Sequence, residues 1–482
     1  MHNVHEFLCN VKLCMPSMKK SVILQLLVVL HASLLSLNCG LNFGWPSPSV
    51  LDLLSESSEF EIDYDYTSYV VMLAPFAVCI GSPIGGVLMN KIGRKYTLLF
   101  LAVLQILSWI CVAASSYVVM LIAGRILAGM SDGILMTSLV VYVCEILQPK
   151  IRGYIGSLPT VSICLGALFV NIYGSFVPVR LSAYISLSFP SLFIIFFVSI
   201  PESPYYLLMH DRSDDARNAL KKLRSSEEVE SELSKITIDI QRQIAEPGTI
   251  KEVFTIKSNL RAFVILLGVR TIQQFSGASA FSFYTHFIFK RAGGEISPAT
   301  SSIICSTVKL LAVFLGLILV EKCGRRSLLL WSSIGSGTVL TILGVYFYFF
   351  ESLEKSSALM WVPIVMMLAY FLLNSIGLIT VPNLIMGELL PVKIKGLVLS
   401  FVNISGGISA GISSKLLQFL DRRFGIYSPF LTFAVFCFIG FVVIYICVPE
   451  TKGKSLEEIQ QILKRKKFRN VDTTSVHYTT KL

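Results

Sequence analysis

Residues 86–95, GVLMNKIGRK, end one apolar run of the chain and begin the next with the turn Gly93-Arg94-Lys95. This turn has a later counterpart, Gly324-Arg325-Arg326, which again stands between two apolar runs. Two further matches follow the turns in the same order: Glu145 with Arg152 and Glu388 with Lys395, then Pro201-Glu202-Ser203-Pro204 and Pro449-Glu450-Thr451-Lys452. Three matches in one order predict that the chain consists of two parallel repeats.

The chain is far more apolar than an ordinary soluble protein, since 54% of its 482 residues are hydrophobic and 15% are charged. Apolar runs of about 20 residues recur along it, long enough for a helix to cross about 30 Å of hydrocarbon. In lipid the backbone must satisfy its own hydrogen bonds, which favours helices over open strands. We therefore predict an all-α membrane protein with twelve spans, at 21–45, 68–90, 96–114, 117–146, 153–174, 181–200, 260–289, 297–320, 327–350, 358–387, 396–420 and 426–448.

One long polar segment divides these spans six and six. The predicted parts are an N-terminus at 1–20, a six-helix bundle at 21–204, linker helices at 205–257, a second six-helix bundle at 258–450 and a tail at 451–482. Lysine and arginine gather in the short loops on one side, whereas the first loop on the other side is acidic. This asymmetry predicts a multi-pass protein of the plasma membrane with both termini in the cytoplasm.

Several classes of function have no support in the sequence. The 11 cysteines form no CxxC pair and lie mostly in apolar runs, so we expect neither a disulfide framework nor a metal site. The net charge of +11 is spread over clusters between spans, which indicates lipid headgroups rather than nucleic acid. Without a Walker-type loop or a nucleophile beside a base, we expect no ATP, no cofactor, no catalytic residue and no enzyme activity. No obligate protein partner is inferred.

Each repeated motif sets acidic residues near a basic turn at a helix end. Gly93 and Gly324 allow the tight turns because they carry no Cβ. We predict ion pairs that form when the cytoplasmic ends close and break when they part. The predicted gating residues are Arg94, Lys95, Glu145, Arg152, Glu202, Glu321, Arg325, Arg326, Glu388, Lys395 and Glu450. The alternative is that the basic residues only set the topology.

An ordered set of motifs covers nearly the whole chain: Gly86 to Lys95, Gly124-Arg125, Glu145 to Arg152, Pro201 to Pro204, Gln273-Gln274-Phe275-Ser276-Gly277, Gly324 to Arg326, Glu388 to Lys395 and Pro449 to Gly453. With this set the chain resembles the sugar porter family of the major facilitator superfamily. Leu158-Pro159-Thr160 and Gly387 to Pro391 are most similar to insect trehalose and glucose facilitators. The resemblance implies two six-helix bundles that carry trehalose or a hexose by alternating access.

Gln273 and Gln274 place two amides in an otherwise apolar span. A buried amide needs partners, and a polyol offers many hydroxyls, although hydrogen bonds between helices would satisfy the amides equally well. The resemblance implies that both glutamines bind sugar. It also implies that Asn403 and Thr160 lie near the site and that Tyr284 belongs to an extracellular gate.

The predicted substrate site departs from the family pattern at several positions. Ser279 replaces an asparagine, Lys309 a neutral amide, Ser375 a glutamate and Asn383 a tryptophan. The lost tryptophan removes an apolar platform for a sugar ring. Two alternatives therefore stay open: a carrier of another small solute such as an organic anion, for which Lys309 is the motivating residue, and a sugar sensor that scarcely transports.

One charged residue and the absence of an acid from the first span lead to further hypotheses. Lys309 is near the middle of its span, where a lone ammonium is unfavourable, so we expect it to pair with Asp132 or to face water. The first span has no acid from Ser21 to Val50, where proton-coupled relatives place an aspartate. A proton carrier needs a titratable group that reaches both sides of the membrane. We therefore predict uniport rather than proton symport.

The charge asymmetry of the loops gives a direct test of topology. Epitope tags at either terminus or within 205–257 should bind antibody only after the cells are permeabilised. Tags in the acidic loop at 55–63 should be accessible on intact cells and serve as the control. Antibody binding to a terminal tag on intact cells would reverse the predicted orientation.

Overall fold

The computed structural model describes residues 20–54, 64–148, 151, 155–224, 229–245, 249–292, 296–350, 361–390, 392–454 and 456–464. Throughout these ranges the regular structure is helical. The acidic loop at 55–63, Arg152 and most of the tail lie outside the described residues.

The six spans predicted for the first repeat are all helices. They are α2 (Lys20–Gly44) with its continuation α3 (Pro46–Leu53), α4 (Tyr64–Lys91), α5 (Arg94–Ala113), α6 (Val118–Ile146), α8 (Leu158–Tyr173) and α9 (Val179–Phe197). Most of them are long and apolar enough to cross a membrane, and α8 is a shorter apolar helix. We refer to α2–α9 as the first half.

The six spans predicted for the second repeat are helical as well, and two of them are interrupted. The second half comprises α14 (Lys257–Phe275), α15 (Ala278–Phe283), α16 (Thr285–Ala292), α17 (Pro298–Cys323), α18 (Arg325–Phe350), α19 (Val362–Asn374), the π-helix η3 (Ser375–Ile379), α20 (Thr380–Glu388), α21 (Val392–Phe424) and α22 (Tyr427–Cys447). Span seven is thus divided into α14, α15 and α16, and span ten is divided by η3. The predicted twelve-helix fold in two six-helix bundles is confirmed.

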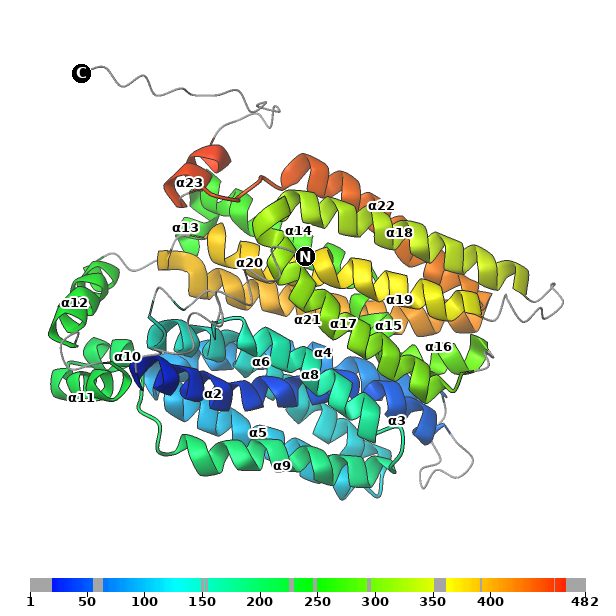
Figure 1. Cartoon of the computed structure of the whole chain (residues 1–482), viewed down its shortest axis with the longest axis horizontal. Coiled ribbons are helices and arrows are strands. Elements are labelled where there is room, and N and C mark those ends of the chain that lie inside the picture. Colours follow the sequence, from blue (N-terminus) through cyan, green and yellow to red (C-terminus); the bar gives the residue numbers. More distant parts are fainter. Residues whose placement is uncertain are drawn as a thin grey trace, which may run out of the picture.

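Short amphipathic helices gather at one end of the molecule. They are α10 (Pro204–Met209), α11 (Ser213–Leu223), α12 (Val229–Ala245), α13 (Ile250–Thr255) and α23 (Leu456–Lys464). Figure 1 shows them at the left end, whereas α3 and α16 lie at the right end. We call the left end the linker end and the right end the far end.

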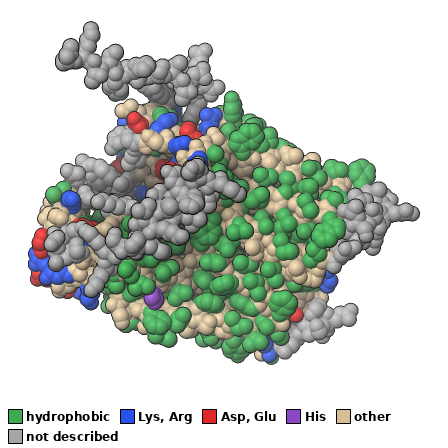
Figure 2. All heavy atoms as spheres, in the orientation of Figure 1, with side chains coloured by type: hydrophobic (Ala, Val, Ile, Leu, Met, Phe, Trp, Pro, Cys, Tyr) green, Lys and Arg blue, Asp and Glu red, His purple; other side chains and the backbone are tan. Residues whose placement is uncertain are grey.

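Apolar side chains cover the flank of the bundle between these two ends. Figure 2 shows hydrophobic side chains over most of this surface and charged side chains gathered mainly at the linker end. Several large apolar residues are strongly exposed, among them Val119, Phe176, Ile195 and Trp331. A soluble protein rarely exposes such a continuous apolar surface, so this belt is the surface that faces lipid.

The two halves meet most extensively along two helix pairs, α4 with α21 and α8 with α17. At Gly407 and Gly411 of α21 a Cβ atom would collide with Pro75 and Phe76 of α4. Glycine at these two positions therefore lets the backbones approach closely, as is common between helices in membranes.

Span seven breaks at Ser276 and Gly277, and neighbouring side chains satisfy the groups that the break releases. Gly277 has a φ of 89°, which ends α14. The Tyr370 hydroxyl donates to the Ser276 carbonyl at 2.9 Å, and Asn374 Nδ2 donates to Ser276 Oγ at 2.9 Å. Both partners come from α19, directly before the π-helix. The two interruptions therefore support each other, as breaks at membrane depth require.

The break at Gly277 predicts different effects for two glycine substitutions in span seven. A Cβ at Gly277 would be strained by about 1–2 kcal/mol and would collide with Phe281. At Gly268 nothing lies within 4 Å of a Cβ, and alanine is the better helix former by about 1 kcal/mol. We expect Gly277→Ala to lower the unfolding temperature in detergent by several degrees and Gly268→Ala to maintain or raise it. Equal unfolding temperatures, measured by size-exclusion chromatography after heating, would contradict a strained break.

Candidate functional site

The last turn of α14 carries the paired glutamines, and both are buried. Gln273 Oε1 accepts a hydrogen bond from Arg270 Nη1 at 2.7 Å. Gln274 Oε1 accepts one from the Ser279 hydroxyl at 2.6 Å, across the break between α14 and α15. Both amide oxygens are therefore engaged by the protein. Within the described part of the chain no side chain or carbonyl accepts from either amide nitrogen, so these nitrogens are left as donors.

Arg270 belongs to the same group, although the sequence analysis did not select it. Its Nη1 also lies 3.5 Å from Asn383 Oδ1 of α20. Its side chain passes over Gly406 of α21, where a Cβ would meet Arg270 Nε. Arg270 could have been found from the sequence, because it is a charged residue in an apolar span, one helical turn before Gln273. Charges inside membrane spans usually have a function.

Lys309 lies at the other side of the break, and its predicted ion pair with Asp132 is wrong. Its Nζ donates to Ser282 Oγ of α15 at 3.0 Å. Asp132 is buried within the first half, where it accepts from Asn42 Nδ2 of α2 at 3.4 Å and lies near Arg125. The two residues are thus held by different neighbours, because α6 turns Asp132 toward α2 whereas α17 turns Lys309 toward α15.

The remaining predicted substrate residues differ in how near they lie to the two glutamines. Ser279 and Asn383 contact the glutamine group as described, whereas no described contact joins Thr160 or Asn403 to it. Thr160 is half-buried in the first turn of α8, and Asn403 is buried in α21. Tyr284 is buried at the end of α15 among aromatic side chains of the second half.

A cluster of charges fixes three helix ends of the first half at the linker end. Arg94 of α5 forms two hydrogen bonds with the Glu145 carboxylate of α6, at 3.0 and 2.9 Å. The Glu202 carboxylate accepts from the backbone N–H groups of Arg94 and Lys95 at 3.0–3.1 Å. Ser203 Oγ donates to Glu145. Burial raises the pKa of the Glu202 carboxyl, although the N–H groups that it accepts from and the Arg94 charge act in the opposite direction.

The second half repeats this cluster group by group. Arg325 of α18 binds Glu388 of α20 at 3.1 and 2.9 Å, and it also binds Glu321 at 3.0 Å. The Glu450 carboxylate accepts from the N–H groups of Arg325 and Arg326 at 2.9 and 3.1 Å. Thr451 Oγ1 donates to Glu388, as Ser203 does to Glu145.

The outcomes for the other predicted gating residues differ. Lys95 Nζ and Arg326 Nη2 both donate to backbone carbonyls, at 2.6 Å in each case. Lys395 Nζ donates to the Gly387 carbonyl at 3.3 Å rather than to Glu388. Arg152 lies outside the described residues. The clusters that the structure describes each lie within one half.

Several side-chain hydrogen bonds join the two halves at the far end. The two ring nitrogens of His286 on α16 are hydrogen-bonded to Ser47 Oγ at 2.8 Å and Ser175 Oγ at 2.9 Å, and both serines belong to the first half. Lys415 Nζ of α21 donates to Ser68 Oγ of α4 at 2.6 Å. Sequence reasoning gave no signal for these contacts, because serine and histidine in apolar runs form no motif.

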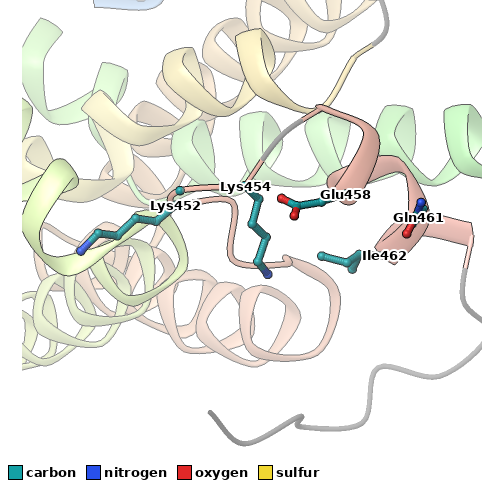
Figure 3. Close-up of a pocket in the computed structure, with 6 residues that line it drawn as sticks. Lys452, Lys454, Glu458, Gln461 and Ile462 are labelled. Atoms are coloured by element: carbon teal, nitrogen blue, oxygen red, sulfur yellow. The ribbon is translucent and has the colours of Figure 1, made fainter. Parts of the chain in front are cut away.

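A surface recess at the linker end is separate from the glutamine group. It is lined by Lys452, Gly453, Lys454, Glu458, Gln461 and Ile462, from the segment after α22 and from α23 (Figure 3). Its lining belongs to the tail, away from the break in span seven.

Comparisons with known proteins find relatives over most of the chain. The family model described as "Sugar (and other) transporter" matches residues 34–463. The facilitated trehalose transporter Tret1-2 homolog of Drosophila simulans is 37% identical over 445 residues, which are 91% of this chain and 90% of that protein. The facilitated trehalose transporter Tret1 of Apis mellifera ligustica is 33% identical over 444 residues, 91% and 88% of the two chains.

Solved structures share the fold at lower identity. The proton:xylose symporter XylE bound to 6-bromo-6-deoxy-D-glucose has a TM-score of 0.73 at 22% identity, over 91% of this chain and 98% of that chain. The inward open conformation of XylE from E. coli has a TM-score of 0.74 at 21% identity, over 90% and 99%.

The cluster of the second half predicts a loss of stability when its arginine is removed. Arg325→Ala leaves Glu388 without its guanidinium, and we expect a loss of about 2 kcal/mol, below the value for a fully buried pair because Glu388 is 27% exposed. Lys322→Ala, at an exposed side chain of the adjacent helix end, is the matched control. If both variants unfold at the wild-type temperature in detergent, the cluster does not hold the helix ends together.

Proposed function

The chain belongs to the sugar transporter family of the major facilitator superfamily, and we propose that it carries trehalose or a hexose down its concentration gradient by alternating access. The observation that carries this proposal is the buried glutamine pair beside the break in span seven. Interrupted helices near the middle of the membrane are where carriers of this kind bind their solutes. Two amide nitrogens without a protein acceptor suit the hydroxyl oxygens of a sugar.

We propose roles for the predicted substrate residues around this pair. Gln273 and Gln274 donate to the solute, and Ser279 fixes the orientation of the Gln274 amide through its 2.6 Å hydrogen bond. Asn383, Lys309, Asn403 and Thr160 complete the site from neighbouring helices. Tyr284 closes the site on the far side, where α15 ends.

The transport cycle that we propose moves the two halves as rigid bodies. The clusters of Arg94 with Glu145 and of Arg325 with Glu388 each join helix ends within one half. We assign the gate at the linker end to these clusters together with Lys95, Arg152, Glu202, Glu321, Arg326, Lys395 and Glu450. Because each described cluster stays within one half, it holds in place the helix ends that come together when the linker end closes. The bonds of His286 to Ser47 and Ser175 must break when the far end opens, since they join the halves.

We further infer the orientation in the membrane. The linker end, with its basic loops, lies in the cytoplasm of a cell whose plasma membrane holds the protein, and both termini lie on that side. The far end faces outward. Because the first span carries no acid, the proposed transport is uniport, which equilibrates the solute and does not accumulate it.

Flux into proteoliposomes that contain the full chain tests the proposal. We expect labelled trehalose or glucose to equilibrate across the membrane, with no effect of a protonophore. Gln273→Ala and Gln274→Ala should each weaken the apparent affinity about tenfold, since a lost hydrogen bond to a buried hydroxyl costs about 1–3 kcal/mol.

The control for these variants is Gln461→Ala, which changes an exposed glutamine of α23. It should transport as the wild type does. Accumulation above equilibrium that the protonophore abolishes would refute uniport. Wild-type affinity in both Gln273→Ala and Gln274→Ala would assign the pair a purely structural role.

A further inference from the structure

The polar groups around the break in span seven have an unusual balance of donors and acceptors. The amide oxygens of Gln273 and Gln274, the main acceptors of the pair, are occupied by Arg270 and Ser279. The groups left for a solute are the two amide nitrogens and the free N–H groups of Arg270 and Lys309, all of which donate. A neutral sugar hydroxyl both donates and accepts, whereas a carboxylate only accepts.

Two of these donors are cations that lack a carboxylate partner. Arg270 donates to the neutral amide oxygens of Gln273 and Asn383, and its Nε is buried with no partner among the described residues. Lys309 donates to the Ser282 hydroxyl. Among the described residues neither cation forms an ion pair. By contrast, three arginines at helix ends, Arg94, Arg325 and Arg291, bind the carboxylates of Glu145, Glu388 and Asp421.

Both cations lie where the halves of the molecule meet. Lys309 is on α17 beside Leu310 and Val313, which pack against Cys164 of α8 in the first half. Arg270 lies against Gly406 of α21, the helix that packs on α4 of the first half. Along span seven Arg270 precedes the glutamine pair and Ser282, the partner of Lys309, follows it. The pair is therefore flanked by positive charge on both sides.

An unpaired cation inside a membrane protein is unfavourable unless an anion or water compensates it. A solute that carries a negative charge supplies the missing partner when it binds. Charge-assisted hydrogen bonds to a carboxylate are about twice as strong as neutral ones. The binding energy of such a solute would therefore come mainly from the two residues, Arg270 and Lys309, that have no acid of their own.

We propose that this sugar carrier prefers a sugar acid, a polyhydroxylated monoanion, over a neutral sugar, and that Lys309 is the residue that selects the carboxylate. This rests on the proposed function of sugar transport through the same site. The hydroxyl oxygens accept from the amide nitrogens of Gln273 and Gln274, and the carboxylate accepts from Lys309 Nζ. Arg270 holds the Gln273 amide in its orientation and adds the second positive charge.

Uptake of labelled glucuronate and glucose by proteoliposomes with the full chain tests this proposal. We expect glucuronate to have an apparent affinity at least tenfold higher than glucose. Its uptake should increase when a potassium gradient with valinomycin makes the vesicle interior positive, because a uniporter of a monoanion moves net charge. Glucose uptake should not respond to this potential.

Variants of Lys309 separate a role in selection from a role in folding. Lys309→Gln restores a neutral amide and should lower the ratio of glucuronate to glucose uptake at least tenfold. Lys309→Arg keeps the charge and should keep the preference for glucuronate, and Arg270→Gln should reduce that preference. Lys290→Gln, at an exposed lysine of α16, is the matched control and should behave as the wild type.

The outcomes distinguish this inference from the function on which it rests. Glucose or trehalose uptake without uptake of glucuronate or competition by it would overturn the sugar acid and leave sugar transport standing. An unchanged preference in Lys309→Gln would likewise overturn the role of Lys309. If neither neutral sugars nor glucuronate enter or compete, both the proposed function and this inference fail.

Discussion

The structure depends on the requirement that backbone polar groups in hydrocarbon find partners within the protein. Uninterrupted helices meet it by themselves, and most spans do so. Span seven does not, because it stops at Ser276 and Gly277, and two side chains of α19 supply what the break removes. Tyr370 and Asn374 thereby couple the interruption in span seven to the π-helix in span ten. Since α15 then starts in a new direction, Ser279 reaches the Gln274 amide, and the polar site exists only because the break is stabilised.

Charge at the helix ends follows from the internal repeat. In each half an arginine at the first position of a helix binds the acid at the end of another, while a second glutamate accepts the N–H groups of the same first turn. A carboxylate is favourable there because the start of a helix carries a partial positive charge and unpaired N–H groups. Both clusters stay within their own half. The boundary between the halves instead relies on close glycine packing and on neutral contacts such as those of His286, which can separate at a modest cost.

Charged residues in the middle of the bundle have different partners from those at the helix ends. Asp132 and Arg125 lie near each other in the first half, whereas Arg270 and Lys309 in the second half bind only neutral oxygens. Electrostatic interactions are stronger where water is excluded, so this excess of positive charge favours a solute with negative charge between the halves. The site therefore combines amide donors that suit the hydroxyl groups of a sugar with two cations that have no carboxylate partner among the described residues.

The sequence alone determined the class of protein, because the length and apolarity of twelve runs leave few alternatives in water or lipid. The matched motifs identified the repeat, the acids and bases of each helix-end cluster and the glutamine pair, since each of these is a local pattern. The sequence did not reveal that Arg270 is the partner of Gln273 or that His286 is hydrogen-bonded to Ser47 and Ser175. Nor did it reveal that Tyr370 donates a hydrogen bond to the break in span seven. It also led to the wrong partner for Lys309, because the position of both residues near the middle of their spans favoured Asp132. Depth is set by position along a span, but a contact also requires that two helices turn the same faces toward each other. Only the tertiary arrangement of the helices decided that rotation. It directs Asp132 to Asn42 of α2 and Lys309 to Ser282 of α15, so the two charges have different neighbours.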